Sequence, residues 1–197
     1  KYHFALIDSH TSDIVADPQN ALKRFSRGMD FYLVQDFDSS IADFTKSILL
    51  DGNFFPAYFM RALVRFKQLE YKKAEALSDN NSSSAGDGKQ ETGVTGVDYE
   101  VVKKDLDKVI ELAPDFVYGY YDRGNVFSAL KDYRSALEDY NKVIEMDPEF
   151  AEAYFNRGLT HIFLGNNKQG IMDLSKAGEL GIVSAYNIIK RFTDIRE

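Results

Sequence analysis

Apolar positions recur along most of the chain at steps of three and four residues, the spacing that gathers them on one face of an α-helix. Between residues 117 and 150, Tyr120 and Phe127 fall on one face of a first helix, and Ala136 and Tyr140 fall on one face of a second. A short polar turn separates the two runs. A proline soon after the second run ends it, because the residue before a proline is pushed out of the helical conformation. The pattern therefore predicts a helical hairpin.

The helical hairpin recurs along the chain with a fixed period of about 34 residues. Residues 117–150, VYGYYDRGNVFSALKDYRSALEDYNKVIEMDPEF, are followed in 151–184 by AEAYFNRGLTHIFLGNNKQGIMDLSKAGELGIVS. An arginine before a small residue marks the frame at Arg27-Gly28, Arg61-Ala62, Arg123-Gly124 and Arg157-Gly158. Such helix pairs cannot bury their apolar faces alone, so they stack on one another. We therefore expect about four stacked units.

An insertion interrupts the second unit. Arg61 and Arg123 stand farther apart than one period and closer together than two, so extra chain lies between them. The surplus falls between Tyr71 and Asp105, because Asp105 is again in frame. Residues 78–98, SDNNSSSAGDGKQETGVTGVD, are rich in Ser, Gly, Asn and Asp. This composition predicts a flexible loop, whose closure cost grows only slowly with its length.

The repeats divide the chain into an amino-terminal segment, four units and a carboxyl-terminal segment. We interpret residues 1–20 either as an extended arm or as the remnant of a preceding repeat's second helix. The four units span 21–54, 55–116 with the insertion, 117–150 and 151–184. Residues 185–197 show helical spacing and predict a capping helix, because a stacked array needs a cover for its last unit.

Specific residue types recur at fixed positions of the unit. An aromatic residue stands near the fourth position, Gly or Ala at the eighth and Pro at the thirty-second, and the twentieth position holds Ser40, Val102, Ala136 and Gly170. Over residues 21–184 this pattern resembles the tetratricopeptide repeat (TPR) family. Departures are Ile182 in place of the proline of the fourth unit, and Arg24 and Gly52 in place of the aromatic residue and the proline of the first. The arginine at the seventh position resembles a bacterial Arg-Gly variant of the family.

The resemblance implies an all-α fold: a right-handed superhelical solenoid of about four TPR helix-turn-helix units with a C-terminal capping helix. It also implies that the first helices line a concave groove. The groove positions that it implies in this sequence are Phe25, Met29, Tyr32, Phe59, Leu63, Phe66, Tyr118, Tyr121, Asn125, Phe155, Leu159 and Ile162. A large exposed apolar stripe of this kind marks an interaction surface. The alternative for each ring is packing between adjacent repeats, or cover by the chain's own ends.

Some family members bind acidic C-terminal tails through a clamp of Lys and Asn in the groove. Here the fifth position of each unit is aromatic, and Asn125 is the asparagine among the groove positions. That clamp is therefore not carried over to this chain. An apolar or aromatic peptide, or a helix, is the favoured ligand.

An arginine and an aspartate recur together in all four units. The pairs are Arg27 with Asp43, Arg61 with Asp105, Arg123 with Asp139, and Arg157 with Asp173. We predict that each guanidinium reaches an aspartate of its own or the adjoining repeat, because its planar fork binds a carboxylate at two points. Such pairs hold the register between helices and are structural. The alternative is that both groups point to water.

Composition narrows the function. The formal net charge is −7 and the sequence pI is near 5.1, so the chain lacks the basic surface of a nucleic-acid binder. It has no cysteine, which excludes disulfides, thiolate metal sites and cysteine nucleophiles. No apolar run approaches the roughly 18 residues of a membrane-spanning helix. His3 and His10, near Asp8 and Asp13, are too weak a pattern to predict a metal site.

These observations predict a scaffold that binds a peptide or protein segment, with no catalytic residues, metal or cofactor. The alternative is a structural spacer or self-assembly module of a longer bacterial protein, with its groove filled internally and self-association expected. The chain begins at Lys1 without a methionine, so we expect it to be a piece of a longer protein. Its compartment is open: cytoplasm, or periplasm if a signal peptide lies upstream.

Overall fold

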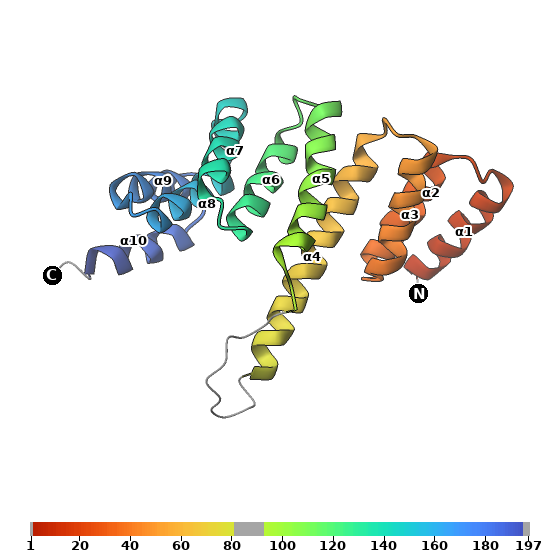
Figure 1. The fold of residues 1–197 in the computed structure, drawn as a ribbon, viewed down its shortest axis with the longest axis horizontal. Helices are drawn as coiled ribbons and strands as arrows, with labels where there is room; N and C mark the ends of the chain where they lie inside the picture. The colour runs from red at the N-terminus through yellow and green to blue at the C-terminus, as the bar shows by residue number, and fades with distance from the viewer. Residues whose placement is uncertain (1, 81–92, 195–197) are drawn as a thin grey trace. The chain divides into compact units, whose positions relative to one another are not determined.

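The computed structural model describes residues 2–80 and 93–194, and within these residues ten α-helices follow one another (Figure 1). The chain divides into two compact units, Lys1–Ala113 and Pro114–Glu197. Within each unit, every helix packs on the helix that precedes it. The all-helical fold expected from the sequence is therefore confirmed for the described residues.

The first unit holds five helices. Their bounds are α1 Tyr2–Ala16, α2 Ala21–Leu33, α3 Phe37–Leu50, α4 Phe55–Asn80 and α5 Gly96–Leu112. Side-chain oxygens cap two of the helix starts: Asn20 Oδ1 accepts from Lys23 N, and Asp36 Oδ1 accepts from Ser39 N, each at 3.1 Å. A capping side chain satisfies a backbone N–H that has no partner inside the helix.

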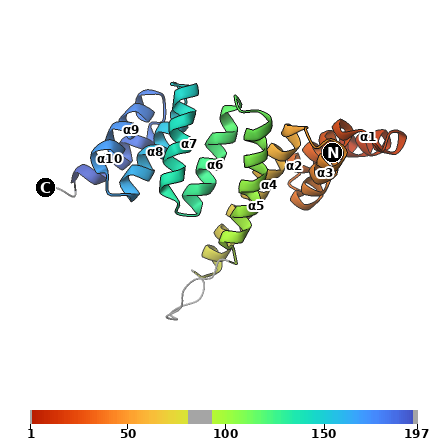
Figure 2. The ribbon, with the colours of Figure 1, turned by 45° about the horizontal axis from the view of Figure 1, so that its top comes forward.

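The second unit holds the remaining five helices, which lie side by side in chain order (Figure 2). Their bounds are α6 Val117–Ala129, α7 Tyr133–Met146, α8 Ala151–Phe163, α9 Asn167–Glu179 and α10 Ser184–Asp194. The first helices of its two repeats, α6 and α8, also touch each other directly. This contact brings side chains from two successive repeats onto one face.

Three of the four repeats turn through one residue with a positive φ. These residues are Gln35, Lys131 and Gly165, with φ of 64°, 62° and 80°. The equivalent residue of the second repeat is Leu69, which is 7% exposed and lies inside helix α4. The residues that turn in two other repeats, Gln35 and Lys131, are polar and exposed, whereas the apolar Leu69 stays buried because the helix continues there.

Helix α4 therefore enters the predicted insertion. It runs to Asn80, and α5 begins at Gly96, so both ends of the stretch 78–98 are helical rather than loop. Asp98 accepts a hydrogen bond from the backbone N of Thr95 at 2.7 Å, a capping contact that starts α5. The centre of the predicted loop, residues 81–92, lies outside the described residues.

The two helices of each repeat cross closely where the small residues stand. A Cβ added to Gly124 would meet the Tyr140 ring at 2.7 Å, and one added to Gly28 would meet the Phe44 ring at 2.8 Å. Phe44 and Tyr140 stand at the same position of the repeat frame, as do Leu106 and Leu174. All four are at most 1% exposed. The small residue of the first helix thus makes room for the largest core side chain of the second.

The two ends of the chain are helical. Helix α1 packs on α2, so residues 2–16 are not the extended arm that was one of the two alternatives. Helix α10 packs on α9 and buries Ala185 fully. It begins at Ser184, just before the expected start of the cap, and residues 195–197 lie outside the described residues.

Candidate functional site

The frame arginines each form a two-point ion pair with the aspartate of their own repeat. Nε donates to Oδ2 at 2.7 Å in Arg27–Asp43, 2.9 Å in Arg61–Asp105, 2.8 Å in Arg123–Asp139 and 2.8 Å in Arg157–Asp173. Nη2 donates to Oδ1 of the same carboxylate at 2.6–2.8 Å. The aspartates are only 4–5% exposed. This geometry joins the two helices of a repeat and leaves these carboxylates occupied.

The frame arginines of the first, second and fourth repeats also donate a hydrogen bond to the helix that precedes their own helix in the chain. Nη1 donates to Thr11 in the case of Arg27, to Thr45 in the case of Arg61 and to Asn141 in the case of Arg157, at 3.2, 3.1 and 2.7 Å. Thr11 and Thr45 stand one repeat period apart, and Asn141 is in the same frame. Helix α1 therefore takes the place of the second helix of a preceding repeat.

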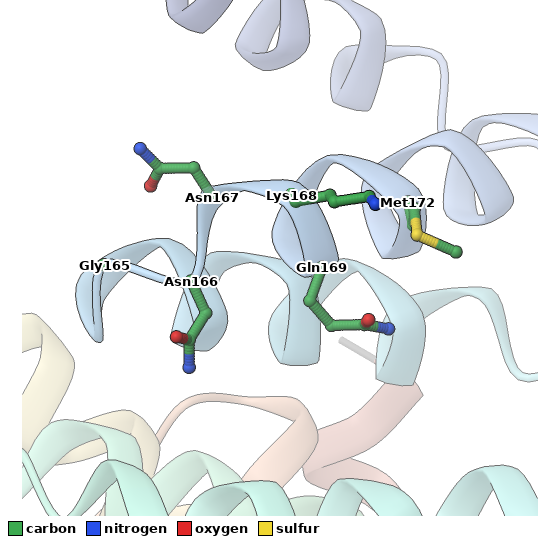
Figure 3. A pocket seen from close by; sticks show the side chains of 6 residues that line it. All are labelled: Gly165, Asn166, Asn167, Lys168, Gln169 and Met172. Carbon is green, nitrogen blue, oxygen red and sulfur yellow. The ribbon is translucent and has the colours of Figure 1, made fainter.

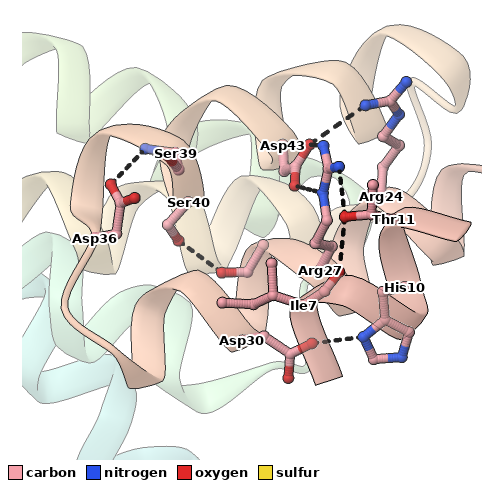
Figure 4. A network of polar contacts seen from close by, with 11 residues as sticks. Ile7, His10, Thr11, Arg24, Arg27, Asp30, Asp36, Ser39, Ser40 and Asp43 are labelled. Atoms are coloured by element: carbon pink, nitrogen blue, oxygen red, sulfur yellow. Dashed lines mark hydrogen bonds and ion pairs between the residues drawn. The ribbon is translucent and has the colours of Figure 1, made fainter. Parts of the chain in front are cut away.

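Around α1 the polar groups of the first unit are largely satisfied (Figure 4). Arg24 Nη1 lies 3.5 Å from Asp43 Oδ1, beside the Arg27 pair, whereas Arg24 Nε is buried without a hydrogen-bond partner in the described structure. His10 Nδ1 lies 2.5 Å from Oδ2 of Asp30, which is 5% exposed. Because these charges already have partners inside the unit, the network serves packing rather than recognition.

In the first unit the six predicted groove residues are half-buried. Phe25 packs against Phe44 and Phe54, with ring centroids 5.4 and 5.2 Å apart. Phe66 packs edge-on against Tyr99 of α5 at 6.0 Å. These rings fill the space between helices, which is the alternative that the sequence left open for them. The six residues are Phe25, Met29, Tyr32, Phe59, Leu63 and Phe66.

The predicted groove residues of the second unit divide into two groups. Phe155, Leu159 and Ile162 pack against the buried cluster of Leu174, Ala177 and Ala185, so they belong to the core of the last repeat. Tyr118 is 49% exposed, and Tyr121 and Asn125 are half-buried beside it on α6. Of the twelve predicted groove residues, Tyr118 is exposed and the other eleven are half-buried, and their place in a groove stays a prediction.

A polar cluster links α6 with α8 instead. The amide Nδ2 of Asn156 donates to Tyr121 Oη at 3.1 Å and to Asn125 Oδ1 at 2.9 Å. Asn125 Oδ1 also accepts from Tyr140 Oη of α7 at 2.9 Å, because a phenol at this core position needs a buried partner. We call Tyr121, Asp122, Asn125 and Asn156 the α6–α8 face.

Asp122 is the charged member of the α6–α8 face. Its side chain is half-buried, and Asn125 Nδ2 approaches its Oδ1 at 3.4 Å. Burial raises the pKa of Asp122 to about 7, because a desolvated carboxylate favours its neutral form, while the Asn125 hydrogen bond acts in the opposite direction. Burial also raises the pKa of Tyr121. Asp122 therefore keeps its proton to a higher pH than an ordinary aspartate does.

Reasoning from the sequence missed Asp122, Asn156 and Tyr140 as site residues. A signal existed, because Asp122 and Asn156 stand one repeat period apart and occupy the sixth position of their units. The groove positions taken from the family did not include the sixth. Only the contact between α6 and α8 shows that this position shares a face with Asn125.

A hollow of about 540 Å³ lies at the turn between α8 and α9 (Figure 3). Its lining residues are Gly165, Asn166, Asn167, Lys168, Gln169 and Met172, of which only Lys168 is ionisable. Asn166 and Gln169 point to the same side, and Asn167 points away from them (Figure 3). This set lacks the paired acid and base groups that general acid–base catalysis needs.

Across residues 2–80 and 93–194, no three His, Asp or Glu side chains lie close enough together to hold a metal ion. In those same stretches, no helix has both the length and the apolar character needed to cross a membrane.

Two family profiles match the second unit. A profile described as "TPR repeat" matches residues 124–165, and one described as "Tetratricopeptide repeat" matches residues 151–180. Residues 124–180 of this chain are therefore similar to tetratricopeptide repeats. The stretch that the two profiles match, residues 124–180, includes the Arg157–Asp173 pair and also Asn125 and Asn156 of the α6–α8 face.

Solved TPR structures share the fold of this chain. A crystal structure of MamA is 20% identical with a TM-score of 0.71, covering 91% of this chain and 89% of that one. MamA from Desulfovibrio magneticus RS-1, residues 41 to the end, is 16% identical with a TM-score of 0.71, covering 88% and 82%. The first TPR of Spaghetti (RPAP3), bound to an HSP90 peptide, is 20% identical with a TM-score of 0.58, covering 76% and 96%. No curated protein sequence matches the chain closely enough to count as a relative.

Proposed function

We propose that this chain is a non-catalytic scaffold that binds a peptide or protein segment, and that the α6–α8 face is a recognition surface of its second unit. The observation that carries the proposal is the pair of side-chain amides, Asn125 and Asn156, held 2.9 Å apart across two neighbouring first helices. One similar TPR structure contains a bound peptide, which supports this class of ligand.

The amide pair is suited to a peptide backbone. Asn156 uses its Nδ2 hydrogens on Tyr121 and Asn125, while its Oδ1 accepts no side-chain or capping hydrogen bond among the described residues. An extended peptide carries an N–H donor at each residue other than proline and needs such acceptors when it leaves water. Because Asn156 is held by two hydrogen bonds before binding, little side-chain entropy is lost when a ligand docks.

The test is selection from a library of random seven-residue peptides displayed on phage, with the full chain as bait. We expect a sequence family to be enriched, and we expect Asn156→Ala to weaken a selected peptide at least tenfold. Asn167→Ala is the matched control, because it removes the same amide from a residue that points away from its neighbours at the α8–α9 turn (Figure 3). An enrichment no greater than that of uncoated beads would refute the proposal.

A structural spacer or self-assembly module is the alternative function. Light scattering of the full chain over a hundredfold concentration range separates the two, because an assembly module gains mass with concentration and a monomeric receptor does not. The bacterial Arg-Gly variant of the repeat remains a prediction from the sequence.

A further inference from the structure

We propose that Asp122 is the anchor for a cationic side chain, lysine or arginine, of the peptide that the α6–α8 face binds. The inference deepens the proposed function and rests on it. It assigns a charge to the ligand, where the sequence favoured an apolar or aromatic peptide or a helix.

The first argument is the partner that Asp122 lacks. The five aspartates buried to 5% exposure or less all have a cation or a histidine beside them: Asp30 has His10, Asp43 has Arg27, Asp105 has Arg61 and Arg65, Asp139 has Arg123, and Asp173 has Arg157. Asp122 is half-buried, yet the side-chain contact that it makes in the described structure is a long one to a neutral amide. A desolvated carboxylate without a cation is unfavourable, and an arriving cation removes that penalty.

The second argument is the setting of the carboxylate. Asp122 is half-buried rather than sealed, so a ligand group reaches it from solvent. Its neighbours on the face offer neutral oxygen and nitrogen atoms, which suit a peptide backbone on either side of a charged side chain. Glu152 at the start of α8 is exposed and adds negative potential near Tyr121. The net charge of −7 attracts a cationic peptide at long range.

The site predicts a specific pH dependence. A cation binds the ionised form of Asp122, so binding strengthens as the carboxyl loses its proton. With a pKa of about 7, the ionised fraction rises about tenfold between pH 6 and pH 8, and affinity follows it. Of the other titratable groups facing Asp122 within the second unit, Tyr121 and Tyr140 stay protonated over this range, because burial raises both their pKa values. Two further charged groups lie near the face: Glu152 beside Tyr121, and Asp139, which is paired with Arg123, beside Tyr140.

The experiment uses the same phage library at pH 8 with three baits: the full chain, Asp122→Asn and Glu138→Gln. Asp122→Asn keeps the shape of the side chain and removes its charge. Glu138→Gln removes one charge from an exposed position on α7 and is the matched control. We expect lysine or arginine to be enriched at one peptide position for the full chain and for Glu138→Gln, and this enrichment to disappear for Asp122→Asn.

The selected peptide is then synthesised with its lysine or arginine intact and with norleucine in that place. We expect the cationic peptide to bind about tenfold more tightly at pH 8 than at pH 6, with the norleucine peptide and Asp122→Asn both showing flat profiles. Peptides that bind equally well to the full chain and to Asp122→Asn would overturn this inference and leave the proposed function standing. Failure to select any peptide would refute the proposed function, and this inference with it.

Discussion

The Arg157–Asp173 pair gives the sharpest test of what holds the repeats together. Arg157 donates to Asp173 at 2.8 and 2.7 Å and to Asn141 at 2.7 Å, so one guanidinium ties α8 to α9 and to α7. The side chains of Arg157 and Asp173 are 16% and 5% exposed. Arg157→Ala leaves Asp173 in the helix interface with only His161, whose Nε2 is 4.0 Å away, as a residual cation source.

The expected loss is large for a single substitution. Removing one partner of a buried ion pair costs about 3–5 kcal/mol, and we place Arg157→Ala at the lower end, about 3 kcal/mol, because its guanidinium keeps some contact with water. For a chain of this length, 1 kcal/mol corresponds to about 2–4 °C in Tm, so the expected fall is about 6–12 °C. Arg157→Lys keeps the charge but not the fork, and we expect roughly half of that loss.

Urea denaturation followed by circular dichroism measures the effect. Lys142→Ala is the matched control, because Lys142 forms a one-point pair with Glu145 at 3.1 Å in which the side chains are 41% and 71% exposed. We expect less than about 0.5 kcal/mol from the control. Replacing both members of the buried pair, as Arg157→Met with Asp173→Leu, should recover much of the single loss, because no charge is left alone. An Arg157→Ala variant as stable as the control would refute the structural role of the pair.

Three further predictions concern packing and pH. Gly170→Ala should destabilise the chain by about 1–3 kcal/mol, because the new Cβ would lie 2.6 Å from Ile162 and 2.8 Å from a backbone oxygen. This loss is expected in spite of the better helix propensity of alanine. Gly52→Ala is the control and should not destabilise the chain, because the space around Gly52 is open. Between about pH 4 and 7 the folded chain keeps a proton on the Asp122 carboxyl that the unfolded chain releases, so the free energy of unfolding falls as pH rises. Asp122→Asn should lack this fall when urea unfolding is measured across that pH range. Burial lowers the pKa of His161, so stability falls as pH drops below the unfolded value of about 6.5, and His161→Gln should reduce this acid loss in a thermal melt.

Much of the helical arrangement follows from the repeat frame. The Arg and Asp positions and the small residue of each first helix recur in all four units, so local spacing is enough to place them. The Arg–Asp partners in the structure are those of the same repeat, a choice that the sequence left open. The end of helix α4 is harder to predict from the sequence. The Ser, Gly and Asn residues after it favour a loop, while Leu69 at the turn position favours a continuing helix.

The candidate site was less accessible from the sequence. The groove positions suggested by the family differ in burial: Phe155, Leu159 and Ile162 pack against the core of the last repeat, whereas Tyr118 is exposed. Periodicity shows which residues share one face of a helix, but it does not show how deeply each aromatic ring is buried between two helices. The α6–α8 face depends on the contact between α6 and α8, which brings together side chains of two successive repeats.

By itself, the sequence determined the class of fold and the frame of the repeat, because helix formation and hairpin packing depend on short-range spacing of apolar, small and charged residues. Tertiary structure alone decided which polar groups are satisfied within the chain. Four aspartates of the frame lie against their arginines, whereas Asp122 lies half-buried beside a neutral amide. Desolvation depends on all atoms around a group rather than on its neighbours in the chain, so this difference appears only when the helices are packed.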